Sequence, residues 1–251
     1  MKLAQGRHQP HTPAPCGRLV SLRFLIAEAE VELVPAEVAG HPAVRKGAEQ
    51  QGRRPSEILL DQNLHGQAMS RLDDGKRRGR PDILHYTLLT LLESPLAKQN
   101  RIQVAVHTRH NLLIHVRPDT RLPRGEARFQ GLLAKVLREG KSHDKEPLLW
   151  IDGECTPKHA VKTFAKGPVI RLDENAPVMA PTELVKLAKD GELTVVLGGF
   201  PSGQFLPAWV EAAPQTASIW PEALNAWAVA AELAAAFRWQ VPAPTVPANP
   251  S

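Results

Sequence analysis

The sequence predicts an α/β fold in which helices pack on a sheet of largely parallel strands. Apolar runs of strand length alternate with segments of helical periodicity along most of the chain, which is typical of this fold class. The segment 221–237 is rich in Ala and has little polar surface, so we expect a helix buried against another element. With 251 residues, the chain is long enough for a sizeable core in one domain or two.

Both ends of the sequence are rich in proline and lack periodicity. We therefore expect mobile tails at 1–17 and 240–251, on either side of a single domain at 18–239. The first residues lack the apolar stretch of a secretory signal, and no run approaches the roughly 18 apolar residues of a membrane span. Cys16 and Cys155 have no pairing context, which suits a reducing compartment and predicts a cytoplasmic location.

Six apolar runs have the length and composition of strands. Two of them, 102–108 and 112–116, also have the pattern of a hairpin that turns at 109–111. The full set of expected strands is 19–26, 102–108, 112–116, 148–151, 168–172 and 193–198.

Proline, threonine and glycine mark the ends of the expected helices. Pro81 suits the first position of a helix whose leucines form one apolar stripe and which Pro95 stops. The segment 181–191 is expected to start at a Thr cap and to end at its Gly. The segment 71–80 is expected to be a charged loop. The stripe after Pro81 consists of Leu84, Leu88, Leu91 and Leu92.

A further helix is expected from Glu126, closed by Gly140. Its apolar stripe faces the core, and its start decides where two arginines lie. If the helix begins near Pro123, Arg124 and Arg128 fall on one face, where like charges at this spacing are unfavourable. The placement raises the question of what anion they hold.

The positive charge of the chain is concentrated in one segment. The net charge is +5, and the segment 61–130 alone has the same excess, with twelve basic and seven acidic residues. Most of these basic residues are Arg, which suits bidentate contacts with phosphates. We interpret 61–130 as a basic RNA-binding segment; the alternative is a solvated basic face.

Two loops near the C-terminus are candidates for ligand binding. In 195–205 a strand runs into a glycine-rich turn, where the backbone can approach a ligand at the carboxyl end of the sheet. A plain tight turn is the alternative. In 218–227 a short apolar loop is expected to enter the last helix at Pro221, and its alternative is a hydrophobic helix entry without a ligand.

Other chemistry is not indicated. His107, His110 and His115 lie in or beside strands, but no Cys or acid stands at ligand spacing, so we expect no metal site. Asp82 and His85 have the spacing of a helix-start contact rather than of a catalytic pair. The sequence lacks a dinucleotide fingerprint, a Walker lysine and a nucleophile elbow.

Six segments occur in an order that resembles the ribosomal-RNA pseudouridine N(1)-methyltransferases, a family of the SPOUT class of S-adenosylmethionine enzymes. The resemblance spans about residues 19–238, and the opening "AEAEVELVP" is more similar to archaeal members than to eukaryotic ones. Ser202 stands where relatives often have His. The six segments are "LLDQNLHGQAMSRL", "GRPDILHYTLLTLLESPL", "VHTRHNLLIHVRPDTRLPR", "RFQGLL", "GGFPSGQF" and "SIWPEALNAW".

The resemblance implies a SPOUT-type parallel sheet flanked by helices, with a C-terminal trefoil knot over 168–238 that holds S-adenosyl-L-methionine. It also implies a homodimer with cofactor sites near the subunit interface. The RNA-binding arginines that it implies are Arg80, Arg121, Arg124 and Arg128, and its candidate catalytic residues are Asp82 and Arg80. The cofactor-binding residues that it implies are Leu172, Gly198, Gly199, Phe200, Pro201, Gly203, Ile219, Trp220, Pro221, Glu222, Ala223 and Leu224.

The implied reaction is methyl transfer to N(1) of a pseudouridine in small-subunit ribosomal RNA, as a step of ribosome biogenesis. That ring N–H is weakly acidic, so an Arg would stabilise the developing ring anion, and Asp82 would hydrogen-bond the base or accept its proton. Two alternatives stay open. One is a non-catalytic RNA-binding assembly factor, because 171–177 differs from the family's first cofactor loop. The other is an enzyme that methylates a different base.

Overall fold

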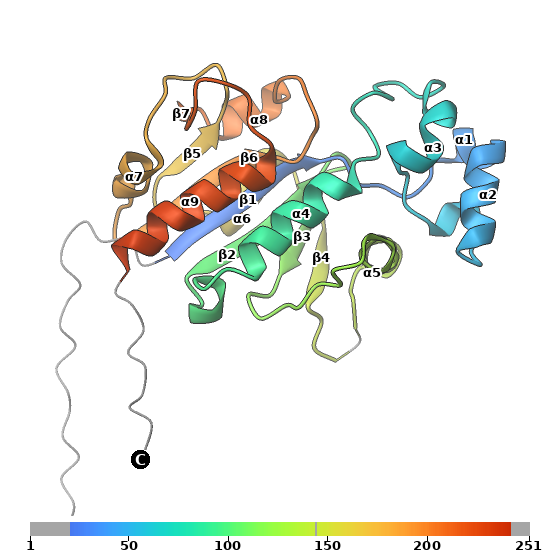
Figure 1. Cartoon of the computed structure of the whole chain (residues 1–251), viewed down its shortest axis with the longest axis horizontal. Coiled ribbons are helices and arrows are strands. Elements are labelled where there is room, and N and C mark those ends of the chain that lie inside the picture. Colours follow the sequence, from blue (N-terminus) through green and yellow to red (C-terminus); the bar gives the residue numbers. More distant parts are fainter. Residues whose placement is uncertain (1–20, 144, 242–251) are drawn as a thin grey trace, which may run out of the picture.

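A seven-stranded sheet forms the centre of the computed structural model, which describes residues 21–143 and 145–241 (Figure 1). The strand order is β4-β3-β2-β1-β6-β5-β7. Neighbours from β2 to β7 run parallel, whereas β3 is antiparallel to both β2 and β4. The bounds are β1 Ser21–Ala29, β2 Ile102–Thr108, β3 Leu112–Val116, β4 Leu149–Glu154, β5 Val169–Leu172, β6 Glu192–Gly198 and β7 Thr216–Ala217.

Helices cover both faces of this sheet. Along β1, alternate side chains point to opposite faces, so Phe24 packs in the core beneath α4, α5 and α9, and Leu25 packs in the core beneath α6 and α8. Figure 1 shows α4 and α9 side by side on one face. The bounds are α4 Pro81–Leu92, α5 Glu126–Glu139, α6 Pro157–Phe164, α7 Pro181–Leu184, α8 Pro207–Ala212 and α9 Ala226–Gln240.

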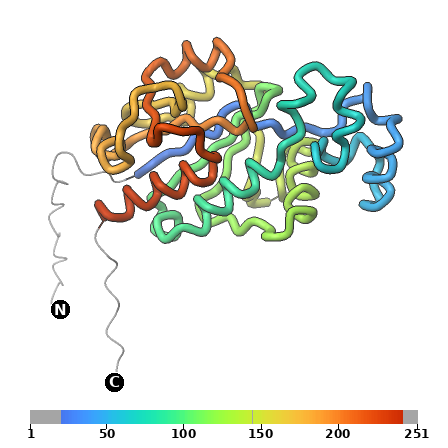
Figure 2. Tube along the Cα trace, turned by 45° about the horizontal axis from the view of Figure 1, so that its top comes forward, coloured from blue at the N-terminus to red at the C-terminus, as the bar shows by residue number. Residues whose placement is uncertain are grey.

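The remaining helices form a lobe beyond the end of β1. The lobe consists of α1 Ala36–Ala39, α2 Pro42–Gln50 and α3 Gln62–Met69. It has its own small core around Val44, Ile58 and Leu60. In Figures 1 and 2 the lobe stands at one end of the molecule, and β5, β7 and α7 stand at the other.

Most expected elements are confirmed. The hairpin strands have the predicted bounds, α4 begins with Pro81 at its first position, and Gly140 ends α5 in the left-handed conformation. The segment 71–80 forms turns rather than a helix, as expected. The expected tails, and Cys16, lie outside the described residues, except that α9 includes Gln240.

Two helix starts differ from the prediction, whereas α5 begins at Glu126 as the sequence predicts. Pro123 stays outside that helix, and its carbonyl oxygen lies 2.8 Å from His85 Nε2. In α7 the first residue is Pro181, so Ala180 and not a Thr stands at the cap, and the helix tightens into a 3-10 turn after Leu184.

The second difference concerns the last helix. Residues 221–225 form an irregular loop, and α9 starts at Ala226 after Asn225. Asn is a favoured residue before a helix, and the first intrahelical bonds go to the Asn225 carbonyl. The helix packs along α4, as its low polarity predicts.

Within 21–143 and 145–241, no helix has the length and apolar character required to cross a membrane. The trefoil knot implied for 168–238 stays a prediction.

Candidate functional site

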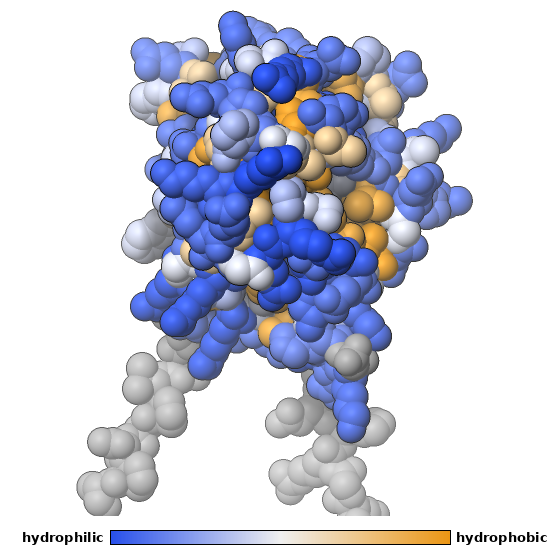
Figure 3. Space-filling view, turned by 90° about the vertical axis from the view of Figure 1, so that its right-hand side faces the viewer, coloured by the Kyte–Doolittle hydropathy of each residue, from blue (hydrophilic) through white to orange (hydrophobic). Residues whose placement is uncertain are grey.

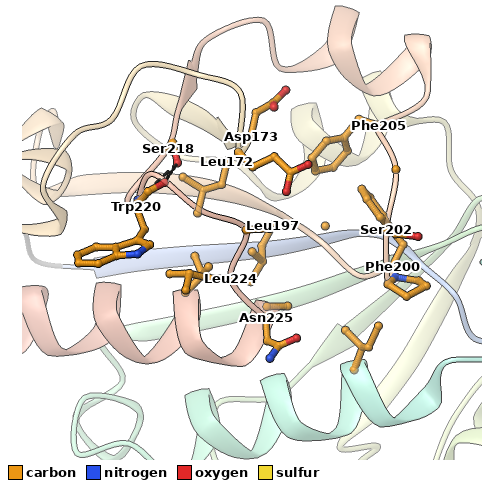
Figure 4. Close-up of a pocket in the computed structure, with 18 of the residues that line it drawn as sticks. Leu172, Asp173, Leu197, Phe200, Ser202, Phe205, Ser218, Trp220, Leu224 and Asn225 are labelled. Atoms are coloured by element: carbon orange, nitrogen blue, oxygen red, sulfur yellow. Dashed lines mark hydrogen bonds between the residues drawn. The ribbon is translucent and has the colours of Figure 1, made fainter.

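A pocket of about 440 Å³ opens where β5 and β6 end and α9 begins (Figure 4). Open α/β sheets bind ligands at this carboxyl edge, and the volume lies in the range of small-molecule sites. Three segments line the pocket, namely 172–174, 197–205 and 218–229, together with Arg80 and Ile83 at the start of α4.

The first segment turns at Asp173, directly after β5. Arg171 Nη1 donates to Asp173 Oδ2 at 3.0 Å, and the backbone N–H of Asn175 donates to Asp173 Oδ1 at 3.0 Å. The Arg171 guanidinium is buried over the Phe205 ring, 5.0 Å from its centre. These contacts fix the Asp173 carboxylate in the pocket wall beside Leu172 (Figure 4).

In the second segment, the glycines have different structural tasks. Gly203 has a φ of +91°, which favours glycine. Gly199 lies against β1, where an added Cβ would stand 2.8 Å from the Cα of Ala29. Its N–H donates to the Ala27 carbonyl at 2.7 Å. The structure therefore places Gly199 behind the pocket wall, and its missing side chain allows packing on β1 rather than approach to a ligand.

The third segment is the loop before α9. Ser218 Oγ donates to the Trp220 carbonyl at 2.6 Å and closes a turn (Figure 4). The Trp220 residue is 55% exposed, and Leu224 is also exposed at the pocket. The loop is thus a wall of the pocket, and not the simple helix entry that would leave no room for a ligand.

Ten of the twelve cofactor-binding residues implied by the sequence line this one pocket, and the exceptions are Gly199 and Pro221. Other lining residues were not named one by one, although eight of them lie within the predicted loops 195–205 and 218–227, namely Leu197, Ser202, Gln204, Phe205, Ser218, Asn225, Ala226 and Trp227. Sequence reasoning missed Ile83, Asp173, Glu174 and Val229, of which Asp173 carries a positional signal because it directly follows a strand.

Arg80 is brought to the same pocket by the start of α4. Its backbone N–H donates to the Glu30 carbonyl at 2.9 Å. Its guanidinium forms a bidentate pair with Asp82, with Nε–Oδ1 at 2.8 Å and Nη2–Oδ2 at 2.7 Å. Asp82 does not line the pocket. In this structure both Asp82 oxygens are engaged in orienting Arg80.

The other implied RNA-binding arginines lie outside the pocket and are exposed. Arg124 is 83% exposed at its side chain, and its Nε is 3.3 Å from Glu93 Oε1, past the end of α4. Across the part of the chain that the structure describes, Arg121 and Arg128 form no ion pair. Arg80 and Glu93 are separated by the length of α4, about 18 Å, so the four arginines do not converge on one point.

Three other arginines of the basic segment are turned inward. Glutamates at every second position where β1 ends are buried, with exposed fractions of 3%, 2% and 4%. Buried carboxylates need counter-charges, and here they are mainly arginines of 61–130. These arginines are therefore not available to RNA, which corrects the interpretation of the charge excess. We call the set the buried acid network; it contains Glu28, Glu30, Glu32, Arg77, Arg78, Arg109 and His110.

Electrostatics differ within the buried acid network. Burial alone would raise the pKa of Glu32, but hydrogen bonds from Arg78 and His110, with their charges, hold this pKa at about 2. For Glu28, burial outweighs the backbone N–H of Leu206 and the charge of Arg77, so its pKa is raised. In the sequence, this network is indicated by glutamates at every second position, 28, 30 and 32, where an apolar strand ends.

The three histidines in or beside β2 and β3 have separate partners and do not meet at one point. His107 Nε2 lies 2.6 Å from the Cys155 carbonyl, His110 Nε2 is 3.0 Å from Glu32, and His115 Nε2 is 2.6 Å from Asp152. Among residues 21–143 and 145–241, no three His, Cys, Asp or Glu side chains form a group that could hold a metal ion.

Known proteins match the chain over most of its length. The family model described as EMG1/NEP1 methyltransferase matches residues 24–238. The ribosomal RNA small subunit methyltransferase Nep1 of Methanothrix thermoacetophila is 36% identical over 212 residues, which cover 84% of this chain and 93% of the relative. The protein of the same name from Pyrococcus furiosus is 37% identical over 221 residues, covering 88% and 97%.

A solved structure is also similar. The crystal structure of Archaeoglobus fulgidus Nep1 bound to S-adenosylhomocysteine superposes with a TM-score of 0.76 at 32% sequence identity. The match covers 89% of this chain and 98% of that one.

Proposed function

We infer, from the premise that this chain belongs to the EMG1/NEP1 methyltransferase family, that it is an S-adenosylmethionine-dependent methyltransferase of small-subunit ribosomal RNA. The observation that carries this inference is the pocket at the carboxyl edge of the sheet, into which Arg80 projects from the basic segment. The proposed cofactor site and the arginine proposed to face RNA would thus meet in one place.

We propose that the pocket holds the methyl donor. Its walls combine apolar side chains, which suit an adenine ring, with the carboxylates of Asp173, Glu174 and Glu222, which suit a cationic sulfonium and amino group. When bound, S-adenosylmethionine supplies an electrophilic methyl group. Loop backbone from 198–203 and 219–224 would supply the donors and acceptors for its polar edges.

The proposed target atom is N(1) of a pseudouridine. Arg80 faces the pocket and is oriented by Asp82, so it is placed to stabilise negative charge that develops on a base in the pocket. Because both oxygens of Asp82 bind Arg80, we assign Asp82 a positioning role first, and proton acceptance only after that pair opens. The base must leave its stack to enter the pocket, and a single-stranded loop lowers that cost.

Arg121, Arg124 and Arg128 are proposed to hold RNA phosphates beside α4 and α5. Their exposure supports this. The end of the molecule that carries the lobe of α1, α2 and α3 is mainly hydrophilic as well (Figure 3). A homodimer is also proposed, supported by exposed apolar side chains beside the pocket. These are Tyr86 of α4, with Trp220 and Leu224 of the loop before α9. Such a substrate fits the cytoplasmic location expected from the sequence.

Calorimetry of the full chain with S-adenosylhomocysteine tests the cofactor site. We expect binding with one site per chain, and the absence of measurable heat would favour the non-catalytic assembly factor. Mass spectrometry of ribosomal RNA from a strain that lacks the gene tests the target. Loss of a methyl group from a pseudouridine is the expected result, whereas loss from another nucleotide would select the alternative enzyme.

A further inference from the structure

We propose that Arg77 is a positioning residue that holds the cofactor loop in shape and links it to the loop that carries Arg80. The inference rests on the proposed function, because it deepens the role of the same pocket. It starts from an observation that this function leaves unused, namely that an arginine of the charged loop 71–80 reaches the pocket-lining segment 197–205.

Arg77 contacts the cofactor loop twice. Its Nη1 donates to the Gln204 carbonyl at 2.9 Å, and its guanidinium carbon lies 3.8 Å from the centre of the Phe200 ring. Both Phe200 and Gln204 line the pocket. Gly203 stands between them with a positive φ, and an added Cβ there would meet Arg77 Nη1 at 3.4 Å. The Arg77 side chain therefore contacts both sides of the tip of the cofactor loop.

Two buried carboxylates hold the arginine in this position. Arg77 Nε donates to Glu30 Oε1 at 3.0 Å, and Nη2 donates to Glu28 Oε2. Glu28 Oε1 in turn accepts the backbone N–H of Leu206 at 2.8 Å, where the cofactor loop ends. Arg77 and Glu28 thus fasten both the tip and the end of the loop.

The same arginine belongs to the chain segment that presents Arg80. The Arg77 backbone N–H donates to the Asp74 carbonyl at 2.7 Å, and three residues later Arg80 enters the pocket. A movement of the loop 71–80 when RNA reaches Arg80 would therefore be transmitted to the cofactor loop through Arg77. Preorganised loops bind ligands more tightly because less ordering is left for the binding step.

Arg78 offers a matched control. It is the next residue, its side chain is similarly buried, and it forms an equally close pair with the buried Glu32, with Nε and Nη2 each at 2.7 Å from a carboxylate oxygen. Its hydrogen bonds go to Glu32 and the Asp73 carbonyl, and it does not line the pocket. Replacing either arginine by Lys keeps the charge but removes the planar fork.

The experiment compares Arg77→Lys and Arg78→Lys in the full chain. Calorimetry measures the affinity for S-adenosylhomocysteine, and differential scanning calorimetry measures Tm. We expect Arg77→Lys to weaken S-adenosylhomocysteine binding by about tenfold or more and to raise KM for S-adenosylmethionine. Arg78→Lys is expected to lower Tm to a similar extent while its S-adenosylhomocysteine affinity stays at the wild-type value.

Glu28→Gln keeps the proposal falsifiable if Arg77→Lys does not fold. Burial raises the pKa of Glu28, so the neutral amide removes a desolvation cost while it still accepts from Leu206. We expect this variant to fold and to bind S-adenosylhomocysteine more weakly than wild type. Wild-type affinity in folded Arg77→Lys or Glu28→Gln would overturn the positioning role alone. Absence of binding by the wild-type protein would instead overturn the proposed function.

Discussion

Arg77, Arg78 and Arg109 lie against buried carboxylates, whereas Arg121, Arg124 and Arg128 lie in solvent. The six residues are alike in sequence, and all belong to the segment 61–130. The difference is made by β1 and the residues directly after it, which bring Glu28, Glu30 and Glu32 to the first group from outside that segment. The charge of a segment is therefore a poor measure of what it offers to RNA, because the counter-charges come from distant parts of the chain.

The largest contrast between the two groups is expected in stability. Arg78→Ala would leave the Glu32 carboxylate buried with only His110 beside it, and removing one partner of a buried pair costs about 3–5 kcal/mol. Arg128→Ala, in the exposed group, should change the free energy of unfolding by about 0.5 kcal/mol or less. Urea titration of both variants measures this; equal losses would mean that the two groups do not differ.

Low pH should selectively weaken the ion pairs of the first group, in which the arginines lie against buried carboxylates. The folded pKa of Glu32, about 2, lies below its ordinary value of 4.5, so its stabilising contribution is complete above pH 4.5 and is lost as the pH falls toward 2. The loss is up to about 3 kcal/mol. The raised pKa of Glu28 acts in the opposite sense, since protonation then favours the folded state.

The difference in unfolding free energy between wild type and Glu32→Gln, followed from pH 6 to pH 2, isolates the Glu32 contribution from that of Glu28. We expect that difference to shrink as the pH falls through this window. A constant difference would show that Arg78 and His110 do not hold the carboxylate charged.

Substitution of an exposed arginine, Arg121, Arg124 or Arg128, should have the smallest effect on stability and the clearest effect on RNA binding. Arg124→Ala should weaken RNA binding and reduce the slope of log K against log salt by about 0.7–0.9. Its affinity for S-adenosylhomocysteine should not change. Lys186→Ala is a fitting control, because that base is also exposed and ion-paired but lies in the 3-10 turn after α7. Filter binding at several salt concentrations gives both slopes, and identical slopes for the two variants would remove Arg124 from the RNA site.

Elements with strong local signals could be predicted from the sequence. The hairpin follows from two short apolar runs around 109–111, and α4 follows from Pro81 and a leucine stripe. The start of α5 at Glu126 was also predictable, but the contact of His85 with the Pro123 carbonyl just before that helix was not, because no local pattern joins two residues so far apart in the sequence.

For the site, the loops were predictable and their partners were not. The family resemblance identified ten residues of the pocket. The position of Asp173 instead depends on its ion pair with Arg171, in a segment that differs from the family pattern. The contact of Arg77 with Gln204 joins positions that only the sheet order brings together. Local patterns carry no information about such pairings.

The central place of β1 has a consequence for how the chain folds during synthesis. In the finished sheet Leu22 pairs with Ile102 on one side and with Leu193 on the other. At roughly 5–20 residues per second, the β6 edge of β1 stays open for on the order of ten seconds or more after β1 is made. Because contacts between distant residues form slowly, the nascent protein exposes an apolar strand edge and has no pocket until its last third emerges.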